Sequence, residues 1–242
     1  MKKIYTFSEV TNKEDLEKCF QMRYAVYAES INKVRLKQNP IRIDINVFDV
    51  HAKHYCLRKD DHIIGYVRLV LPSPELVNES VLEIGDSYSL PLKAEYSRQK
   101  QNAPYPFLSY TNVPPSHWNY YTEIRIKGEQ LIEASRLILH PEHRGLNVSR
   151  FLVECALVLY IEHCDHRKHA IVDCFTNHST FYKSYGFSKI NEDPYLLFGI
   201  PNDTLTLPPL SQENDRIPAR IRNRLVEMAE EFKVRGVLER AL

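Results

Sequence analysis

The spacing of apolar residues alternates along the chain between a helical and an extended period. Apolar side chains recur every three or four positions between Thr11 and Tyr27, and Thr11 and Glu14 form a capping box, which together predict a helix. Shorter apolar runs bounded by turn residues predict strands at 54–58, 63–71, 131–139 and 169–175. Helical periods follow the last two strands, at 146–162 and 177–185. This order predicts a single α/β (α+β) domain with a mixed, mostly antiparallel central sheet flanked by helices.

Two regions do not fit this alternation. Residues 72–128 contain many prolines and aromatic residues, so we interpret them as an irregular insertion that forms either a lid over a pocket or an aromatic-stabilised surface loop. Residues 201–218 are also rich in proline and predict a linker to a final helix at 219–242. We therefore expect one domain at residues 1–200 and a C-terminal appendage at 201–242, which docks on the domain or contacts a partner.

Composition narrows the class of protein. With 242 residues, of which 43% are hydrophobic, the chain can bury a substantial core, and its formal net charge of +1 gives no long-range field for nucleic acid. The sequence contains neither a signal-peptide core nor an apolar run of transmembrane length. Its five cysteines form no C-x-x-C pair and are typical of reduced thiols. We expect a cytoplasmic protein with no nucleic acid partner and no transmembrane segment.

Several charged residues lie inside apolar patterns. Arg23 falls on the apolar stripe of the first helix, and Arg68 lies between Val67 and Leu69 in a strand. An arginine in such a position either extends past the core to solvent or pairs with a buried carboxylate, and Asp44 and Asp49 are candidate partners. These residues predict an internal ion-pair network, which either is purely structural or holds a substrate.

The stretch from Leu131 to Glu162 combines a strand, a tight turn and a long helix, whose first backbone N–H groups suit an anion. Glu133 follows two apolar residues in the strand, so desolvation should raise its pKa and make it a candidate general base. The alternative is that Glu133 is only the counter-ion of Arg68 or Arg136. In a regular strand Glu133 and Arg136 point to opposite faces, so a site that they share predicts a bulge.

Other chemical groups are weaker candidates. The spacing of His163, Cys164, His166 and His169 resembles that of metal ligands, but these residues fall at the end of a helix and we expect no metal there. Cys174 lies within a strand with no histidine at a telling spacing, so we interpret it as a buried thiol.

The motifs resemble those of a known superfamily. HPEHRGLNVS at 140–149, Asn177 and FYKSYGF at 181–187 resemble parts of the Gcn5-related N-acetyltransferase (GNAT) superfamily. Four further motifs resemble, in order, those of acyl-homoserine-lactone synthases and N-acyl amino acid synthases: MRYAVY at 22–27, DINVFD at 44–49, IIGYVRLVLP at 63–72 and EASR at 133–136. The size and motif order of residues 1–200 are similar to those of the acyltransferases associated with PEP-CTERM/exosortase systems.

This resemblance implies an acyltransferase. The chain would move a medium or long acyl chain from an acyl carrier protein or coenzyme A thioester to the α-amine of an amino acid, with no permanently bound cofactor. By the resemblance, Glu133 is the base, Tyr182 is the acid, and an acceptor-binding network consists of Arg23, Asp44, Asp49, Arg68 and Arg136. Backbone N–H groups near Leu137 and Leu139 would stabilise the oxyanion. The thioester and its pantetheine arm would contact Arg144, Gly145, Asn147 and Asn177.

Departures from the family pattern favour particular substrates. Asn147 stands where the family loop has a later glycine, and its side chain narrows the approach of a pyrophosphate, which favours a carrier-protein donor over free coenzyme A. Arg144, Arg150, Arg167 and Lys168 form a candidate basic rim for that acidic carrier. Asp44 and Asn46 stand where homoserine-lactone synthases tend to have glutamate and aspartate. The alternatives are a lactone-forming signal synthase and a non-catalytic domain that binds acyl carriers or fatty acids.

Overall fold

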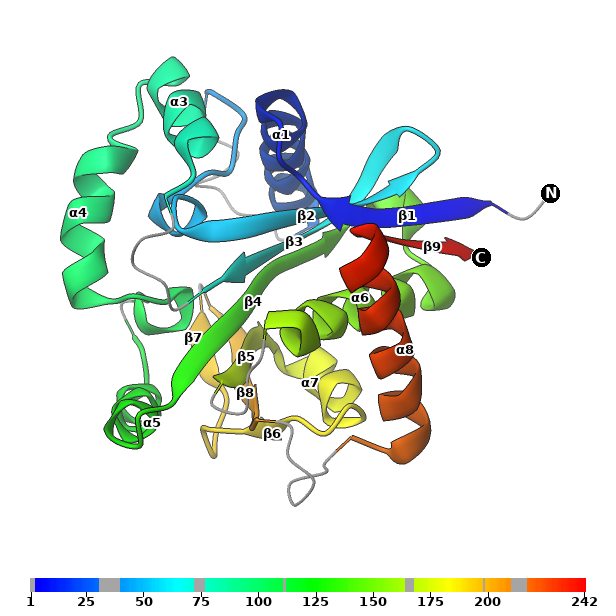
Figure 1. Cartoon of the computed structure of the whole chain (residues 1–242). Helices are drawn as coiled ribbons and strands as arrows, with labels where there is room; N and C mark the ends of the chain where they lie inside the picture. Colours follow the sequence, from blue (N-terminus) through cyan, green and yellow to red (C-terminus); the bar gives the residue numbers. More distant parts are fainter. Residues whose placement is uncertain are drawn as a thin grey trace.

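The computed structural model describes residues 3–30, 40–71, 77–110, 112–163, 168–197, 199–209 and 217–242. Within these residues a nine-stranded sheet has the order β6-β8-β5-β4-β3-β2-β1-β9, with β7 paired to β8 (Figure 1). All pairs are antiparallel except β4 with β5, which confirms a mixed and mostly antiparallel sheet. The strands are β1 Ile4–Glu9, β2 Ala52–Lys59, β3 His62–Val70, β4 Gln130–Leu139, β5 Lys168–Phe175, β6 Ser188–Lys189, β7 Tyr195–Leu197, β8 Ile200–Leu207 and β9 Val237–Ala241.

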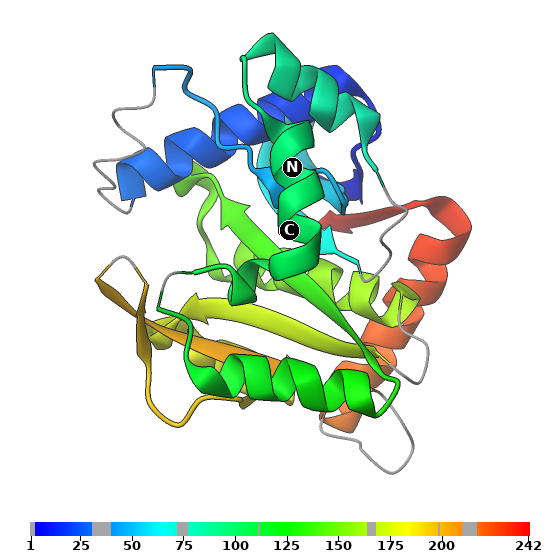
Figure 2. The same cartoon turned by 90° about the vertical axis from the view of Figure 1, so that its left-hand side faces the viewer.

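Helices cover both faces of the sheet. On one face lie α6, α7 and α8, and on the other lie α1, α3, α4 and α5, with α4 and α5 towards the viewer in Figure 2. The α-helices are α1 Lys13–Ser30, α3 Glu79–Ser87, α4 Leu92–Asn102, α5 Pro115–Ile126, α6 Leu146–His163, α7 Thr176–Lys183 and α8 Ala219–Arg235. Single 3-10 turns occur at η1 Val47–Asp49, η2 Pro106–Leu108 and η3 Pro141–His143. No helix in the described ranges has the length and apolar character needed to cross a membrane.

Helix α6 lies at the centre of the larger core. Every residue from 151 to 160 is buried, because the sheet covers one side of the helix and α8 covers the other. The charged side chain in this run, Glu154, accepts hydrogen bonds from Arg150, Tyr185 and Arg224, which satisfies its buried carboxylate. The contact between Arg224 and Glu154 also ties α8 to α6.

The C-terminal region belongs to the same fold. Residues 200–207, predicted as the start of a linker, form strand β8 between β5 and β6, because Pro201 lies at the start of the strand and Pro208 after its end, where neither interrupts the pairing. The predicted final helix is α8. It ends at Gly236, whose φ of 67° is left-handed, and the chain then turns into β9 alongside β1.

The region 72–128 is also more regular than predicted. It contains α3, α4, η2 and α5, which form a wall on one face of the sheet (Figure 2). Its prolines do not oppose helix formation because Pro91 precedes α4, while Pro106 and Pro115 occupy first-turn positions that need no backbone N–H donor. Among its aromatic residues, Phe107 is fully buried against the sheet.

Candidate active site

Strands β4 and β5 separate halfway along their length. They pair in parallel from Gln130 and Lys168 to Ala134 and Val172. Beyond this point β4 continues along β3 as far as Leu139, while β5 continues along β8 as far as Phe175. Past the last pair, the facing edges of β4 and β5 are no longer paired with each other.

A bulge in β4 lies at this separation. Tyr66 is opposite Ile138 and Arg68 is opposite Ser135, so two residues of β4 face the single residue Val67. One of the two is Arg136, whose φ of 56° lies in the left-handed region that a side chain rarely adopts. The irregularity expected from the sequence is present. It places the side chain of Arg136 on the same face of the sheet as Glu133, which is the face that points away from α6.

Glu133 is held inside this face with little solvent contact. Glu133 is 1% exposed, and its Oε2 accepts a hydrogen bond of 3.1 Å from the backbone N–H of Phe107 in η2. Burial and, to a smaller extent, the charge of Asp173 raise the pKa of Glu133. That hydrogen bond and the charges on Arg68 and Arg136 oppose this rise, and the resulting pKa is about 8. A carboxyl group of this kind can both accept and release a proton near neutral pH.

A second group of charges, which we call the buried ion network, consists of Arg23, Asp44, Asp49 and Arg68. Arg23 donates to Asp49 through both terminal nitrogens, at 2.7 and 3.2 Å, and its Nε donates to Asp44 at 3.1 Å. Arg68 donates to Asp49 at 3.0 Å. Burial raises the pKa of Asp49, but Arg23 and Arg68 outweigh burial and hold this pKa well below its usual range. The network joins α1 and η1 to the centre of the sheet.

Polar neighbours complete this network. Arg68 donates from Nη1 to Asn46 at 2.9 Å and from Nε to the Ser135 hydroxyl at 3.0 Å. The ring of His54 lies 2.7 Å from the Tyr66 hydroxyl and 3.0 Å from the carbonyl oxygen of Asp49. Burial lowers the pKa of His54 to about 4, so this ring is neutral at pH 7. The network is therefore saturated with internal hydrogen bonds.

Two predicted acceptor-binding residues reach solvent, and the others do not. The side chain of Arg136 is 25% exposed and that of Asp44 is 11% exposed, whereas those of Arg23, Asp49 and Arg68 are at most 1% exposed. The Arg136 Nε lies 3.3 Å from Asp44 Oδ2, and its guanidinium lies 5.2 Å from the centre of the Tyr27 ring. Arg136 is thus the point at which the buried ion network meets the separation of β4 and β5.

Two further residues belong to the site: Asp173, which was not predicted, and Tyr110, one of the aromatic residues of the region interpreted as a lid or a surface loop. Asp173 lies on β5 immediately after the last pair with β4, and Tyr110 precedes α5. Asp173, Arg136 and Glu133 all affect the pKa of Tyr110, which burial raises well above its usual range, so the four side chains lie near one another. We call Glu133, Asp173, Arg136 and Tyr110 the split-strand cluster. The signal for Asp173 was present in the sequence, because an aspartate in the apolar run HAIVDCF has the same character as Glu133.

The predicted acid, Tyr182, lies on α7 beside the same separation. Burial raises the pKa of its hydroxyl well above the usual range, with further increases from Cys174 and Tyr27. The ring packs at its edge against Phe181 and Phe187. Asn177, predicted to contact the donor, is exposed at the start of α7. Cys174 is buried, as predicted, and burial raises its thiol pKa to about 12.

The turn between β4 and α6 presents the predicted donor-binding residues. Arg144 donates from Nε to the carbonyl oxygen of Leu139 at 3.2 Å, which fixes the end of β4. A Cβ atom added to Gly145 would meet no protein atom within 4 Å, and Asn147 is exposed next to it. The turn is therefore open to a ligand. Leu137 is half-buried and packs towards α6.

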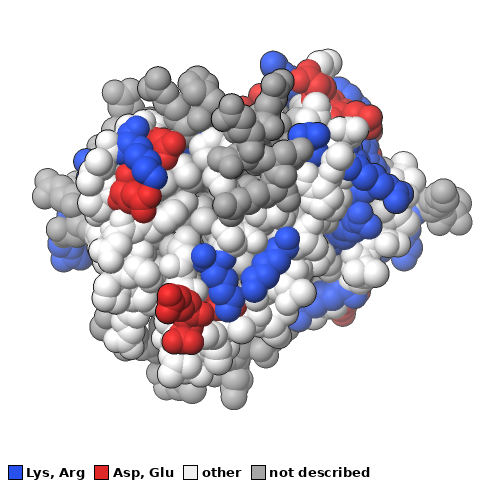
Figure 3. Space-filling model, turned by 90° about the horizontal axis from the view of Figure 1, so that it is seen from below, with Lys and Arg blue, Asp and Glu red and all other residues white. Residues whose placement is uncertain are grey.

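The proposed basic rim is less uniform than predicted. Arg150 forms an ion pair with Glu154, and Lys168 donates from Nζ to the carbonyl oxygen of His163. Arg167 lies outside the described residues. Figure 3, which views the molecule from below, shows basic side chains mixed with acidic ones on the left and a more continuous group of basic side chains on the right, the side on which α8 lies in Figure 1.

The histidines whose spacing resembles that of metal ligands make other contacts. His163 lies 3.2 Å from the Tyr55 hydroxyl, and His169 lies 2.9 Å from Glu129, while Cys164 and His166 fall outside the described residues. A different group, His140, Glu142 and His143 in η3, brings three possible ligand atoms within 4.8 Å of one another. Two lysines, Lys59 and Lys3, contribute to lowering the pKa of His143, and their positive charge disfavours a cation at this position.

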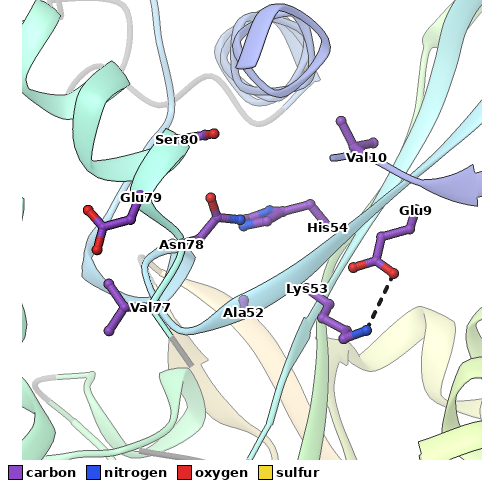
Figure 4. Close-up of a pocket in the computed structure, with 9 residues that line it drawn as sticks. All are labelled: Glu9, Val10, Ala52, Lys53, His54, Val77, Asn78, Glu79 and Ser80. Carbon is purple, nitrogen blue, oxygen red and sulfur yellow. Dashed lines mark hydrogen bonds and ion pairs between the residues drawn. The ribbon is translucent and has the colours of Figure 1, made fainter. Parts of the chain in front are cut away.

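An open hollow of about 350 Å³ lies between β2 and the start of α3 (Figure 4). An ion pair of 3.3 Å between Lys53 and Glu9 lies on one side, and Asn78 and Glu79 lie on the other. His54 lines the hollow as well as bonding to the buried ion network. None of the four residues of the split-strand cluster lines it, so the hollow is distinct from the candidate site.

Comparison with known proteins gives similarity of two kinds. A family model described as an acetyltransferase (GNAT) domain matches residues 22–103. Among solved structures, FeeM, an N-acyl amino acid synthase from uncultured soil microbes, is 12% identical with a TM-score of 0.50, and covers 84% of this chain and 90% of its own. The structure of BjaI, a CoA-dependent acyl-homoserine lactone synthase, with SAM and isopentyl-CoA is 13% identical with a TM-score of 0.56. It covers 92% of this chain and 90% of its own.

A third similar structure is MesI, a CoA-dependent acyl-homoserine lactone synthase, which is 17% identical with a TM-score of 0.51 and covers 91% of this chain and 95% of its own. No curated protein sequence matches this chain significantly. At these identities the likeness establishes the arrangement of helices and strands, and the reaction must be argued from the site.

Proposed function

We propose that this chain, which has a GNAT-like fold, is an N-acyltransferase of the autoinducer-synthase branch and transfers a medium or long acyl chain from a thioester to the α-amine of an amino acid. The observation that carries the proposal is the bulge in β4. It brings Glu133 and Arg136 to one face at the place where β4 and β5 separate, so that a base and a cation border the same opening.

The reaction needs a base because an amino acid carries an ammonium group at neutral pH. Glu133, when ionised, takes one proton from the ammonium, and the neutral amine attacks the thioester carbonyl carbon. The C–N bond forms first and gives a tetrahedral intermediate, and the C–S bond breaks when this intermediate collapses. Of the two protons that the nitrogen loses, one reaches solvent through Glu133 and the other ends on the departing thiolate. The products are an N-acyl amino acid and a free thiol.

The tetrahedral intermediate carries a negative oxygen that must be stabilised. Backbone N–H groups of Leu137 and Leu139, beside the bulge, are our candidates for this role. Tyr182 would assist the leaving sulfur. Because burial raises the pKa of Tyr182, its hydroxyl stays protonated and is suited to donating a hydrogen bond to the thiolate rather than to losing its proton.

Fewer residues contact the acceptor in this proposal than in the five-residue network that the sequence predicted. Arg136 is partly exposed and can form a charge-assisted hydrogen bond with the acceptor carboxylate, while Asp44 orients it from behind. We assign a supporting role to Arg23, Asp49 and Arg68, whose donors and acceptors are already paired inside the protein. They hold η1 and β4 in the arrangement that exposes Arg136.

The donor would enter at the turn before α6. The open space at Gly145 and the first N–H groups of α6 suit one phosphate of a pantetheine arm, with Arg144, Asn147 and Asn177 around it. The side chain of Asn147 stands at the entrance, which favours the single phosphate of an acyl carrier protein over the pyrophosphate of coenzyme A. The side chain of Leu146, 80% exposed beside it, offers an apolar contact for that carrier.

Mass spectrometry distinguishes this proposal from its alternatives. The purified protein is incubated with acyl carrier protein or coenzyme A loaded with chains of several lengths, together with a mixture of amino acids and S-adenosylmethionine. An N-acyl amino acid supports the proposal, and an acyl lactone supports the signal-synthase alternative. The absence of product from any donor, with binding of the loaded carrier retained, supports the non-catalytic alternative.

A further inference from the structure

We propose that Asp173 binds the ammonium group of the acceptor and holds it beside Glu133, so that the site selects a zwitterionic α-amino acid. This inference rests on the proposed function and adds a residue on β5 to a site otherwise built on β4.

Asp173 lies at the mouth of the separation between the strands. Glu133 is directly beside Ile171 in the parallel pairing, and side chains two positions apart on a strand share a face. Ile171 packs in the core on the side of Phe107, whereas Val172 and Cys174 pack on the side of α6. Asp173 therefore faces the same side as Glu133, one step beyond the last pair.

Two hydroxyl groups hold the Asp173 carboxylate in place. Tyr195 of β7 donates to Oδ2 at 2.7 Å, and Thr204 of β8 donates to Oδ1 at 3.0 Å. Asp173 remains half-buried and forms no ion pair with any described residue, in contrast to Asp203 on the neighbouring strand, which pairs with Lys189 at 2.7 Å. Asp173 is thus an oriented carboxylate without a cationic partner in the part of the chain that the structure describes.

The charges around Asp173 favour a small cation. Burial raises its pKa to about 6, the Tyr195 and Thr204 hydrogen bonds lower it, Asp203 raises it, and Arg136 lowers it. At neutral pH it is therefore mostly ionised. Asp173 in turn raises the pKa of Glu133 and of the Tyr110 hydroxyl, while the charges of Arg136 and Arg68 lower both. An ammonium group between the two carboxyl groups would relieve their mutual repulsion, and its proton would lie within reach of Glu133.

Arg136 completes the discrimination because it supplies the opposite charge. An α-amino acid presents an ammonium and a carboxylate on one carbon, and this cluster presents carboxyl groups and a guanidinium around one opening. A simple amine would satisfy only Asp173 and Glu133, and would leave Arg136 without its substrate partner. We therefore expect amines that lack the carboxylate to be poorer acceptors.

The alternative role for Asp173 is structural, as an anchor for β7 and β8. Asp173→Asn tests this because asparagine is nearly isosteric. Its amide oxygen can accept one of the two hydroxyl hydrogen bonds and its amide nitrogen can donate to the other hydroxyl oxygen, while the charge is lost. The matched control is Tyr195→Phe, which removes one anchoring hydrogen bond and keeps the carboxyl group. Because that hydrogen bond lowers the pKa of Asp173, the two variants are compared above pH 8, where the carboxyl group stays ionised. Asp173→Glu is the rescue variant, since it restores a carboxylate on a longer arm.

The experiment measures acceptor KM, kcat, the pH profile and the melting temperature. With Asp173→Asn we expect the acceptor KM to rise about 10–100-fold, the range for losing a hydrogen bond to a charged group, with a melting temperature close to that of the unchanged protein. The acid limb of kcat/KM should also move to lower pH, because Glu133 loses a negative neighbour. Tyr195→Phe should change the acceptor KM little. Asp173→Glu should restore part of the acceptor affinity that Asp173→Asn loses.

Two results would overturn the proposal. One is an unchanged acceptor KM and pH profile in Asp173→Asn, and the other is a loss that Tyr195→Phe reproduces along with a lower melting temperature. A separate readout does not depend on turnover: saturation-transfer NMR with each of the twenty standard amino acids, without donor. Binding that Asp173→Asn abolishes supports the proposal even if no product forms, whereas equal binding to both proteins, or no binding to the unchanged protein, contradicts it.

Discussion

The buried ion network and the split-strand cluster occupy the same face of the sheet, yet their carboxyl groups behave in opposite ways. In the network, two arginines surround Asp49 and hold its pKa well below the usual range despite burial. In the cluster, the pKa of Glu133 is raised to about 8 and that of Asp173 to about 6, because burial dominates over the arginines nearby. Their surroundings differ in the number of close cationic partners.

The difference separates structural charges from candidate chemical ones. A buried ion pair with all its hydrogen bonds satisfied is costly to break, and it has no free position for a substrate. A buried carboxyl group that lacks a close counter-ion has its pKa raised towards neutral pH, so it can both accept and release a proton there, as a general base for an ammonium substrate must. The contrast yields four predictions, from the largest expected effect to the smallest.

Replacing Glu133 by glutamine should lower turnover by about 10²–10⁴-fold, because the site loses its base. Folding should not suffer. The amide oxygen can still accept the Phe107 N–H hydrogen bond, and above pH 8 the variant avoids a buried negative charge, so its melting temperature should equal or exceed that of the unchanged protein. Steady-state kinetics and thermal unfolding at pH 8.5 check both parts. A variant that is unstable but fully active would reverse the assignment.

Arg23→Ala should have the opposite profile, with a loss of about 3–5 kcal/mol in the free energy of unfolding, because Asp49 and Asp44 would lose a buried partner. Urea unfolding at pH 7 measures this loss. Lys18→Ala is a suitable control, since its ion pair with Glu14 is exposed and screened by solvent, so its loss should leave the stability nearly unchanged. A stable Arg23→Ala protein with impaired acceptor binding would instead favour the earlier interpretation that the network contacts the substrate.

Arg136→Ala should raise the acceptor KM by about 10–100-fold with a smaller effect on kcat, because a charge-assisted hydrogen bond to the acceptor carboxylate is lost. The same change should matter little for an amine that has no carboxylate, and this comparison separates substrate contact from a general disturbance of the bulge. Kinetics with an amino acid and its decarboxylated amine provide the measurement. Equal losses on both acceptors would count against the contact.

The pH dependence of stability should differ in sign between the two groups. The folded-state pKa of Glu133, about 8, lies above its ordinary value of 4.5. Between these two values Glu133 is ionised in the unfolded chain and protonated in the folded protein, so the free energy of unfolding falls by about 1.4 kcal/mol per pH unit as pH rises. Asp49, whose pKa is lowered, contributes stability above its ordinary value of 3.8 that is lost as pH falls. Unfolding curves of Glu133→Gln and Asp49→Asn across pH 3–9 should flatten these two regions respectively.

Much of the fold follows from local patterns in the sequence. The strand and helix periods and the bulge at Arg136 were predicted, because each depends on neighbouring residues or on one stated requirement for the site. The errors arose where proline was taken to exclude regular structure. Pro91, Pro115 and Pro201 lie at the first positions of elements or just before them, and tertiary packing decides the rest.

The site was harder to predict because it depends on which strands separate. Glu133 was identified from its apolar neighbours, but Asp173 in an equally apolar run was not. Only the pairing of β4 with β5 shows that Asp173 lies two residues beyond the partner of Glu133, on the same face. Likewise, the sequence could not distinguish Arg136 at the surface of the site from Arg23 and Arg68 inside the protein. Exposure is a property of the assembled sheet.

The pairing of β9 with β1 sets a condition on the order of folding. Ile4 lies opposite Ala241, and the backbone N–H of Leu242 donates to the carbonyl oxygen of Lys3 at 3.1 Å. Such contacts between distant parts of the chain form slowly, and during synthesis the edge of β1 has no strand to cover it until residue 241 leaves the ribosome. A nascent chain stalled within α8 should therefore expose an unpaired edge, and a fusion attached at the C-terminus will emerge beside the first strand.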